Sequence, residues 1–191
     1  MTLLSERAGG LARFVEAYRS MARLPEPVRR PVALGALLGN VVLVFQQSEA
    51  AKRVSIELDL PPDDPQLDVD ETLLIQALLN VLTNAAEAAD SLSGGGLIRI
   101  ALESDIKDIR IVIADQGCGV PETLIDQMFH AFVTTKPNGT GTGLNLARQI
   151  ALAHGGDLLF LGAQDTWSAV FVFTLPTSPK LADVDERLGR A

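Results

Sequence analysis

Two apolar runs that lie close together constrain the fold of this chain more than any other feature. Residues 97–104, LIRIALES, and residues 109–115, IRIVIAD, both have the composition of a strand, and only the short segment DIKD separates them. A connection this short joins antiparallel strands, because parallel strands need a crossover of a dozen or more residues. We therefore expect a β-hairpin.

The remaining predicted elements are segregated along the chain more than they alternate. Periodicity predicts further strands at 54–60, 157–163 and 168–176, and helices at about 32–51, 71–90, 121–129 and 144–154. Asp68 or Asp70 can cap the helix that begins at residue 71. The sequence therefore predicts an α+β fold, a two-layer sandwich in which helices cover one mostly antiparallel sheet.

An amphipathic helix is predicted at residues 2–22, ahead of this domain. Its apolar residues recur at three- and four-residue spacing: Leu11, Phe14, Val15, Tyr18 and Met21. The proline-rich segment LPEPVRRP then ends the helix and begins a linker. We therefore expect a helix and linker at 1–30, a folded domain at 31–178 and a polar tail at 179–191.

Composition argues against some partners and locations. The chain has 191 residues, a formal net charge of −8 and a pI near 4.7, whereas a nucleic-acid partner needs a basic surface. The most apolar stretch, PVALGALLGNVVLVF, is too short for a membrane span of about 20 residues, so we expect no membrane contact here. A lone cysteine, Cys118, without a signal peptide predicts a cytoplasmic location.

The helix at 71–90 predicts a polar site. Asn80, Asn84 and Glu87 stand at i, i+4 and i+7 and therefore share one face. Mg²⁺ is often held by one or two side-chain oxygens plus substrate phosphates, and an asparagine oxygen adds no repulsive charge beside a triphosphate. The helix alone leaves a solvated polar stripe as the alternative.

A glycine-rich loop, NGTGTGL, stands immediately before the helix at 144–154. Its glycines allow backbone N–H groups to approach phosphate oxygens at the positive end of the helix dipole. The loop is neither a P-loop nor a dinucleotide fingerprint, because no Gly-Lys-Ser/Thr follows and Leu144 replaces the third glycine. Lys136 adds a charge for phosphates or simply keeps an exposed lid soluble. A flexible turn without a ligand stays open as the alternative.

The segment DQGCG follows the second strand of the hairpin. Asp115 has no cationic neighbour in sequence, so a buried carboxylate here needs a donor, such as the exocyclic amine of a purine. Gly117 and Gly119 would let a flat ring approach the backbone. An Asp-initiated turn without a ligand is the alternative.

In this order, the motifs closely resemble the ATP-binding domain of sensor histidine kinases, in the GHKL superfamily that includes gyrase. The resemblance spans about residues 50–176. It rests on QALLNVLTNAAEA as the N box, DQGCG as the G1 box, FVTTK as the F box, GTGTGL as the G2 box, and the HGG that follows. It implies the Bergerat fold, a mixed sheet covered by helices, with ATP and Mg²⁺ as ligands.

The resemblance implies roles for the matching residues. Asn84 would be the principal Mg²⁺ ligand with Asn80 beside it, and Asp115 would bind the adenine amine. Gly117 and Gly119 would shape the adenine pocket, and Glu87 would belong to the polar wall of the site. The lid and phosphate turn would consist of Thr135, Lys136, Gly139, Thr140, Gly141, Thr142, Gly143 and Leu144. Asn80, Asn84 and Lys136 would act in catalysis, whereas Cys118 is incidental.

Three departures from the family pattern matter. Thr142 replaces the first leucine of the usual G2 box, which would loosen the lid. Ser168 and Ala169 stand where the last strand usually has Gly-Thr, which puts a contact with the adenine region in doubt. Asn80 stands where related ATPases carry a water-activating glutamate, and an amide cannot be a general base. This last departure favours a kinase over a hydrolase.

The resemblance also implies an acceptor histidine on a separate helical hairpin and relay to the receiver domain of a response regulator. The N-terminal helix resembles the second helix of that hairpin, most like the nitrogen-sensor branch, and the first helix is absent. His130 belongs to the lid and His154 to a helix end, where it would be a cation. We therefore expect Mg·ATP binding without self-phosphorylation, and a homodimer through the hairpin in the full-length protein. An inactive nucleotide-binding module and a GHKL-type ATPase remain as alternatives.

Overall fold

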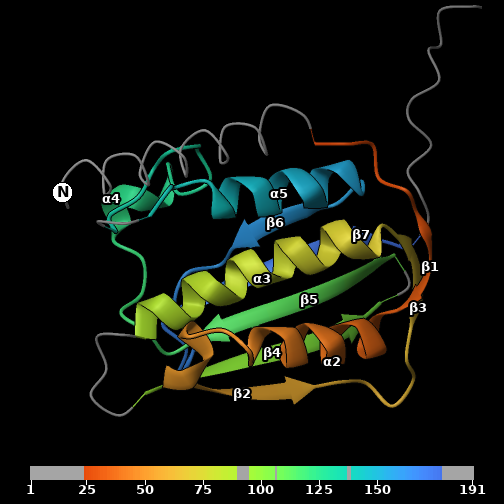
Figure 1. Ribbon diagram of the computed structural model, residues 1–191, viewed down its shortest axis with the longest axis horizontal. Coiled ribbons are helices and arrows are strands. Elements are labelled where there is room, and N and C mark those ends of the chain that lie inside the picture. Colours follow the sequence, from red (N-terminus) through yellow and green to blue (C-terminus); the bar gives the residue numbers. More distant parts are fainter. Residues whose placement is uncertain (1–23, 90–94, 106, 137–138, 178–191) are drawn as a thin grey trace, which may run out of the picture.

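The computed structural model describes residues 24–89, 95–105, 107–136 and 139–177. Its main sheet has five strands in the order β2 (Val54–Asp59), β4 (Gly96–Ser104), β5 (Asp108–Asp115), β7 (Ala169–Pro176) and β6 (Asp157–Phe160). One face of this sheet is covered by α2 (Leu34–Phe45), α3 (Glu71–Ala88) and α5 (Gly143–Ala153) (Figure 1). The predicted α+β sandwich is confirmed, while its N-terminal amphipathic helix lies outside the described residues.

The predicted hairpin is the centre of the sheet. Strands β4 and β5 pair antiparallel from Ile98 opposite Asp115 to Ser104 opposite Ile109. The sheet is mostly antiparallel as expected, since only β2 and β4 run parallel. Successive side chains of a strand point to opposite faces. Alternate residues of β4, β5 and β7 are therefore buried in one core with the helices, including Ile100, Ile111 and Phe173.

Helix α3 begins at the predicted cap. Asp70, not Asp68, is the N-cap residue, and its carboxylate accepts a hydrogen bond from the Leu73 N–H at 3.1 Å. Asp68 lies in the short strand β3 (Gln66–Val69) instead. A side-chain oxygen at the N-cap satisfies an N–H group that has no partner within the helix, which explains why the helix begins here.

The helix predicted at 32–51 is shorter than expected. It begins at Leu34 and ends at Phe45, and residues 50–53 form a 3₁₀ turn. Residues 30–33 form β1 (Arg30–Ala33), which pairs with β3 in a second, two-stranded sheet that the sequence did not predict. The cap of α2 comes from Asp64, whose carboxylate accepts hydrogen bonds from the N–H groups of the first helical turn. This cap lies far along the chain, so no local signal marked the start of α2.

Smaller differences concern α4 and membrane contact. The helix predicted at 121–129 is only one turn, α4 (Glu122–Ile125). Among the described residues, no helix combines the length and the apolar character that crossing a membrane requires.

A polar junction joins α3, α5 and the linker. The Asp70 N–H donates to His154 Nε2 at 2.9 Å, and the Asp70 carboxylate accepts from the Val28 N–H at 2.9 Å. The Arg29 guanidinium donates to the Ala153 carbonyl at 2.9 Å. The start of α3 and the end of α5 therefore meet at the linker, and both helices extend from there toward the opposite end of the domain (Figure 1).

His154 is not the helix-end cation that its position suggested. It is 3% exposed and lies within hydrogen-bonding distance of the Ile150 carbonyl through Nδ1, at 2.8 Å. Because Nε2 accepts from the Asp70 N–H, Nδ1 carries the proton and the ring is neutral. Burial lowers the pKa of His154, and Arg29 lowers it further, although the Ile150 carbonyl and Asp70 act in the opposite direction.

Candidate nucleotide-binding site

The polar face of α3 carries three of the predicted site residues. Asn80, Asn84 and Glu87 lie toward the end of the helix, whereas its apolar residues, including Val81 and Ala85, are buried in the core. The amide nitrogen of Asn80 is enclosed and has no hydrogen-bond partner in the part of the chain that the structure describes. A buried donor without a partner is costly, so an acceptor oxygen from a ligand would stabilise it.

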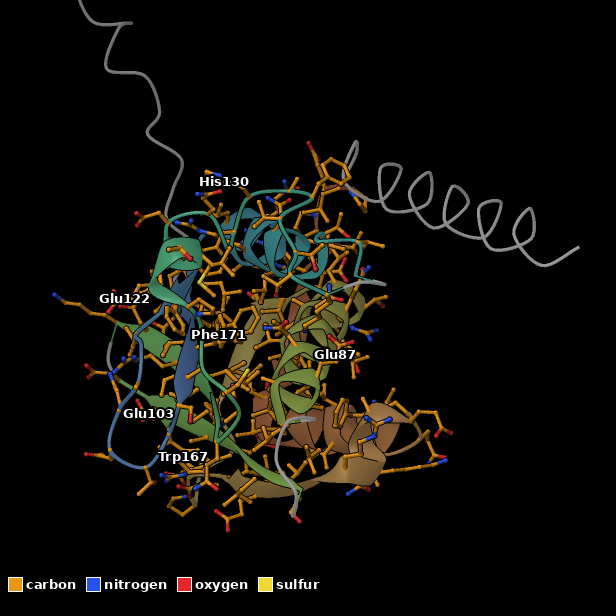
Figure 2. The ribbon with its side chains drawn as sticks, turned by 90° about the vertical axis from the view of Figure 1, so that its left-hand side faces the viewer. Glu87, Glu103, Glu122, His130, Trp167 and Phe171 are labelled. Atoms are coloured by element: carbon orange, nitrogen blue, oxygen red, sulfur yellow. The ribbon has the colours of Figure 1, made fainter. Side chains whose placement is uncertain are left out.

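Lys136 lies across this polar face. Its ammonium donates to Asn84 Oδ1 at 2.7 Å and forms an ion pair with the Glu87 carboxylate, which projects from α3 on the side away from the sheet (Figure 2). An ammonium has donors only, so it selects the oxygen end of the Asn84 amide. A metal cation would select the same end. These residues therefore fit a cation at Asn84, with Lys136 as its stand-in.

Asp115 lies at the end of β5 and is 2% exposed. Its carboxylate accepts a hydrogen bond from the Gly117 N–H at 2.9 Å. Burial raises the pKa of Asp115, although the Gly117 N–H and the positive charge of Lys136 act in the opposite direction. A carboxylate has two acceptor oxygens, so Asp115 has the capacity to accept from a further donor such as an exocyclic amine.

The turn after Asp115 packs against the end of α3. The Cys118 N–H donates to the Ala88 carbonyl at 3.1 Å, and a Cβ at Gly117 would lie 2.6 Å from the Ala88 Cβ. The structure thus explains Gly117 by its packing on α3, a reason different from the ring access that we expected. Gly119 has a φ of 72°, which favours glycine.

Ser168 contacts Asp115 through its backbone. Its backbone N–H donates to the Asp115 carbonyl at 2.8 Å, and Asp115 pairs with Ala169 in the sheet. Both interactions use the backbone, so they do not depend on the Gly-Thr pair that relatives usually have at this place.

The lid, residues 130–143, is closed at its base by two residues with left-handed backbone. The Phe132 N–H donates to the Gly141 carbonyl at 2.8 Å, and the φ angles of Phe132 and Gly141 are 67° and 65°. A Cβ at Gly141 would lie 2.6 Å from the Phe132 carbonyl carbon. Only glycine fits this approach. Thr142, expected to loosen the lid, is buried, and its hydroxyl lies 2.9 Å from that of Thr140.

A tight turn orients Lys136 within the lid. The Lys136 N–H donates to Thr134 Oγ1 at 3.1 Å, and its carbonyl accepts from the Gly139 N–H at 3.1 Å. A Cβ at Gly139 would lie 2.5 Å from Thr134 Oγ1. Thr135 is exposed beside this turn. The lid residues on either side of Lys136 therefore restrict its backbone, while its side chain reaches α3.

The start of α5 faces the amides of α3. A Cβ at Gly143 would lie 3.7 Å from Asn80 Oδ1, so the first backbone N–H groups of α5 lie near the polar face. Leu144, in contrast, is half-buried and packs its side chain against the hydrophobic core. Leu144 is one of the predicted phosphate-turn residues, and its packing against the core explains a leucine at this position without a ligand.

Two residues of α5 that the sequence did not predict hold the segment before the lid against this helix. The Asn145 amide donates to the Phe129 carbonyl at 2.7 Å, and the Arg148 guanidinium lies over the Phe129 ring, 4.9 Å from its centroid. Arg148 also pairs with Asp157. Asn145 and Arg148 stand three residues apart and share a helix face, which is the signal that could have identified them.

A cavity of about 410 Å³ lies elsewhere, at the start of α2. Arg30, Leu37, Asn40 and Glu71 are among its lining residues, and none of the predicted site residues lines it. The unpartnered Asn80 amide and the Asn84 oxygen that binds the Lys136 ammonium lie instead on the polar face of α3, and the buried Asp115 carboxylate lies at the end of β5.

This chain resembles known proteins in both sequence and fold. Residues 69–179 match the family described as histidine kinase-, DNA gyrase B-, and HSP90-like ATPase. Nitrogen regulation protein NtrY of Azorhizobium caulinodans is 30% identical over 184 residues, which cover 94% of this chain and 24% of NtrY. The chain therefore spans about a quarter of the length of this curated relative.

Several solved histidine kinase structures share the fold of this chain. The catalytic domain of histidine kinase ThkA superimposes with a TM-score of 0.69 at 28% identity, covering 79% of this chain and 99% of that one. ThkA in complex with response regulator protein TrrA matches with a TM-score of 0.75 at 23% identity, over 94% of this chain and 51% of that one. Full-length ShkA in complex with AMPPNP matches with a TM-score of 0.75 at 26% identity, over 93% and 38%.

The family match, the shared fold and the arrangement of amides, carboxylate and glycine turn lead to one assignment. The family match covers more than half of the chain, and the ThkA catalytic domain matches over almost its full length. The chain belongs to the histidine kinase-, DNA gyrase B- and HSP90-like ATPase family, in which it carries the ATP-binding catalytic domain of a sensor histidine kinase.

Proposed function

We propose that this domain binds ATP as its Mg²⁺ complex and transfers the γ-phosphoryl group to a histidine of an acceptor hairpin. The observation that carries the proposal is the Lys136 ammonium on Asn84 Oδ1. It means that the amide oxygen is turned toward a cation at the end of α3. Asn84 would hold Mg²⁺, with Asn80 beside it, because this ion takes side-chain oxygens together with phosphates and water. The bound ion supplies neutralisation of charge on the phosphates during transfer.

Asp115 and the turn after it would bind the base. The buried carboxylate has the capacity to accept from the adenine amine, and since burial raises its pKa, a hydrogen-bond donor would stabilise its charged form. Gly119 would lie along the edge of the ring, with Gly117 holding the turn against α3. ShkA, which is similar in fold, was solved with AMPPNP, and this supports an adenine nucleotide as the ligand.

The lid and the start of α5 would bind the phosphates. Helix N-termini attract anions through their free N–H groups and their dipole, and Lys136 adds a full charge. The residues proposed to line this part of the site are Thr135, Lys136, Gly139, Thr140, Gly141, Thr142, Gly143 and the backbone of Leu144. Glu87 would form the outer polar wall.

Transfer to histidine is favoured over hydrolysis by the chemistry of Asn80. A hydrolase needs a base that activates water, and an amide cannot accept that proton. Asn80, Asn84 and Lys136 would instead orient the phosphates and stabilise their charge. Transfer then depends on positioning the γ-phosphoryl group in line with the acceptor.

The proposed partners and location follow from the kinase assignment. We place the second helix of the acceptor hairpin and the linker at 1–30, the catalytic domain at 31–178 and a tail at 179–191. We propose a homodimer through the hairpin of the full-length protein, and a response regulator receiver domain as the next acceptor, as the ThkA complex with TrrA suggests. The use of ATP supports a cytoplasmic location.

Two experiments test the proposal. Calorimetry with AMPPNP, with and without Mg²⁺, should show binding by the wild type and loss of its Mg²⁺ dependence in Asn84→Ala. Asn40→Ala, on the exposed face of α2, is the matched control and should bind like the wild type. Unchanged binding in Asn84→Ala would contradict the cation site.

The second experiment tests transfer. The chain is incubated with labelled Mg·ATP and a partner protein that carries the acceptor hairpin. Label on the histidine of the partner supports the kinase. Binding without transfer would indicate the interaction module, and free phosphate alone would indicate an ATPase.

A further inference from the structure

Glu87 lies one helical turn beyond Asn84 on the same face of α3, and both side chains contact the Lys136 ammonium. In sequence, Lys136 is 52 residues from Asn84 and 49 residues from Glu87. We propose that Glu87 is a positioning residue, which holds Lys136 against α3 when no nucleotide is bound and keeps it beside the site when the cation arrives. The second part of this inference rests on the proposed function.

The charge of Glu87 is what makes this contact favourable. An amide oxygen is a neutral acceptor and compensates an ammonium only in part for the water that it loses, whereas a carboxylate adds an opposite charge. Both side chains remain partly exposed, 37% for Lys136 and 43% for Glu87. Exposed ion pairs are weak and are screened by salt, so Glu87 holds Lys136 reversibly.

Lys136 and a metal ion cannot share Asn84. The ammonium lies 2.7 Å from Asn84 Oδ1, which is where a cation would bind, and two positive charges at this separation repel each other. A cation that arrives with the nucleotide therefore displaces Lys136 from Asn84. Glu87 lies next to Asn84 on α3 and retains the ammonium at the edge of the site.

The geometry of the lid supports this function. The turn around Lys136 restricts its backbone through Thr134 and Gly139, and Asn145 fixes the segment before the lid to α5. The lid is thus held at its base, and Glu87 holds a lid residue, Lys136, whose side chain reaches α3. Burial raises the pKa of Asp115, and the charge of the ammonium acts in the opposite direction, so this charge acts on the adenine side of the site as well.

The experiment measures how fast backbone amides of the lid exchange with solvent when no nucleotide is bound. NMR-detected solvent exchange of the Lys136 and Gly139 amides should become roughly two- to five-fold faster in Glu87→Gln, as expected for the loss of an exposed ion pair. Lys136→Gln should give the same increase, and the double variant no further one. Glu87→Asp, which keeps the charge, should retain part of the protection. Glu103→Gln breaks an exposed ion pair with Arg110 on the hairpin and is the control.

Salt separates an electrostatic function from simple packing. Raising the ionic strength should speed exchange of these amides in the wild type and leave Glu87→Gln unchanged, since only the wild type has the pair to screen. Equal salt dependence in both proteins, or additive effects in the double variant, would overturn the proposal. So would unchanged exchange in folded Glu87→Gln.

A charge reversal separates this proposal from the proposed function. The double variant Glu87→Lys with Lys136→Glu should restore lid protection without nucleotide, yet bind Mg·AMPPNP at least ten-fold more weakly than the wild type, because its lid carries a negative charge toward the phosphates. Failure of the restoration would refute the function of Glu87. If Asn84→Ala bound Mg·AMPPNP normally, the cation site would be refuted while the result on the lid still stood.

Discussion

The imidazole of His154 accepts a hydrogen bond from the backbone N–H of Asp70 at 2.9 Å, and this bond joins the end of α5 to the start of α3. The bond requires an unprotonated Nε2. Protonation would place an N–H of the ring against the N–H of Asp70. The stability of the domain is therefore linked to the charge of His154.

We predict that the domain loses stability as the pH falls below about 6.5. The pKa of His154 is lowered in the folded protein, so the unfolded chain takes up the proton first, near the ordinary pKa of about 6.5. The stabilisation is complete above that pH and decreases toward the folded pKa, by at most about 1.4 kcal/mol per pH unit. Urea denaturation of the wild type and His154→Gln at pH 7.5 and 5.5 measures this.

The free energy of unfolding should differ less between pH 7.5 and pH 5.5 in His154→Gln than in the wild type. His130→Gln changes a histidine in the exposed part of the lid and should keep the pH dependence of the wild type. An equal pH dependence in His154→Gln and the wild type would contradict the assignment.

Asp70→Ala should destabilise the domain by about 1–2 kcal/mol, since it removes the cap of α3 and the acceptor for the Val28 N–H. Asp68→Ala, an exposed position in β3, should change the free energy of unfolding by less than about 0.5 kcal/mol. Urea denaturation at pH 7.5 measures both. Similar losses of stability in the two variants would show that the effect comes from removing a negative charge and not from removing the helix cap.

Asp115→Asn should reduce the preference for ATP over ITP. The carboxylate can accept only, so it favours the amine of adenine over the carbonyl of hypoxanthine, whereas an asparagine can face either group. Hydrogen bonds to charged groups contribute about 1.5–3 kcal/mol, so the wild type should prefer ATP at least ten-fold. Competition binding measures the ratio, with circular dichroism as the control for folding. An unchanged ratio would place the base elsewhere.

Gly141→Ala should weaken nucleotide binding by disturbing the base of the lid. Its φ of 65° and the 2.6 Å approach to Phe132 leave no room for a Cβ. Gly39→Ala is the matched control, because a Cβ there has no neighbouring atom within 4 Å and α2 should gain about 1 kcal/mol from the change. Calorimetry, which measures nucleotide binding, and thermal denaturation, which measures stability, should therefore separate the two variants. Normal nucleotide binding in Gly141→Ala would contradict the requirement for glycine at the base of the lid.

The sequence was sufficient for elements with a strong period. The apolar composition of residues 97–104 predicted β4, and the spacing of Asn80 and Asn84 predicted that they share one face of α3, because the pattern repeats with the geometry of a helix. The binding roles of these residues stay predictions.

The sequence was insufficient where distant residues decide the structure. Strand β1 pairs with β3, and Asp64 caps α2, so both depend on contacts across the fold. The apolar residues Val32 and Ala33 fit a strand and a helix equally well, which hid the boundary at Leu34. The contact between Glu87 and Lys136 likewise became visible only when the lid and α3 were placed together.

The hydrogen bond between Asp70 and His154 joins the start of α3 to the end of α5. The predicted site residues of both helices lie away from this junction: the asparagines on α3 and the first turn of α5. The linker binds this junction through hydrogen bonds from Val28 and Arg29. A displacement of the linker would therefore act on the start of α3 and on the end of α5 together.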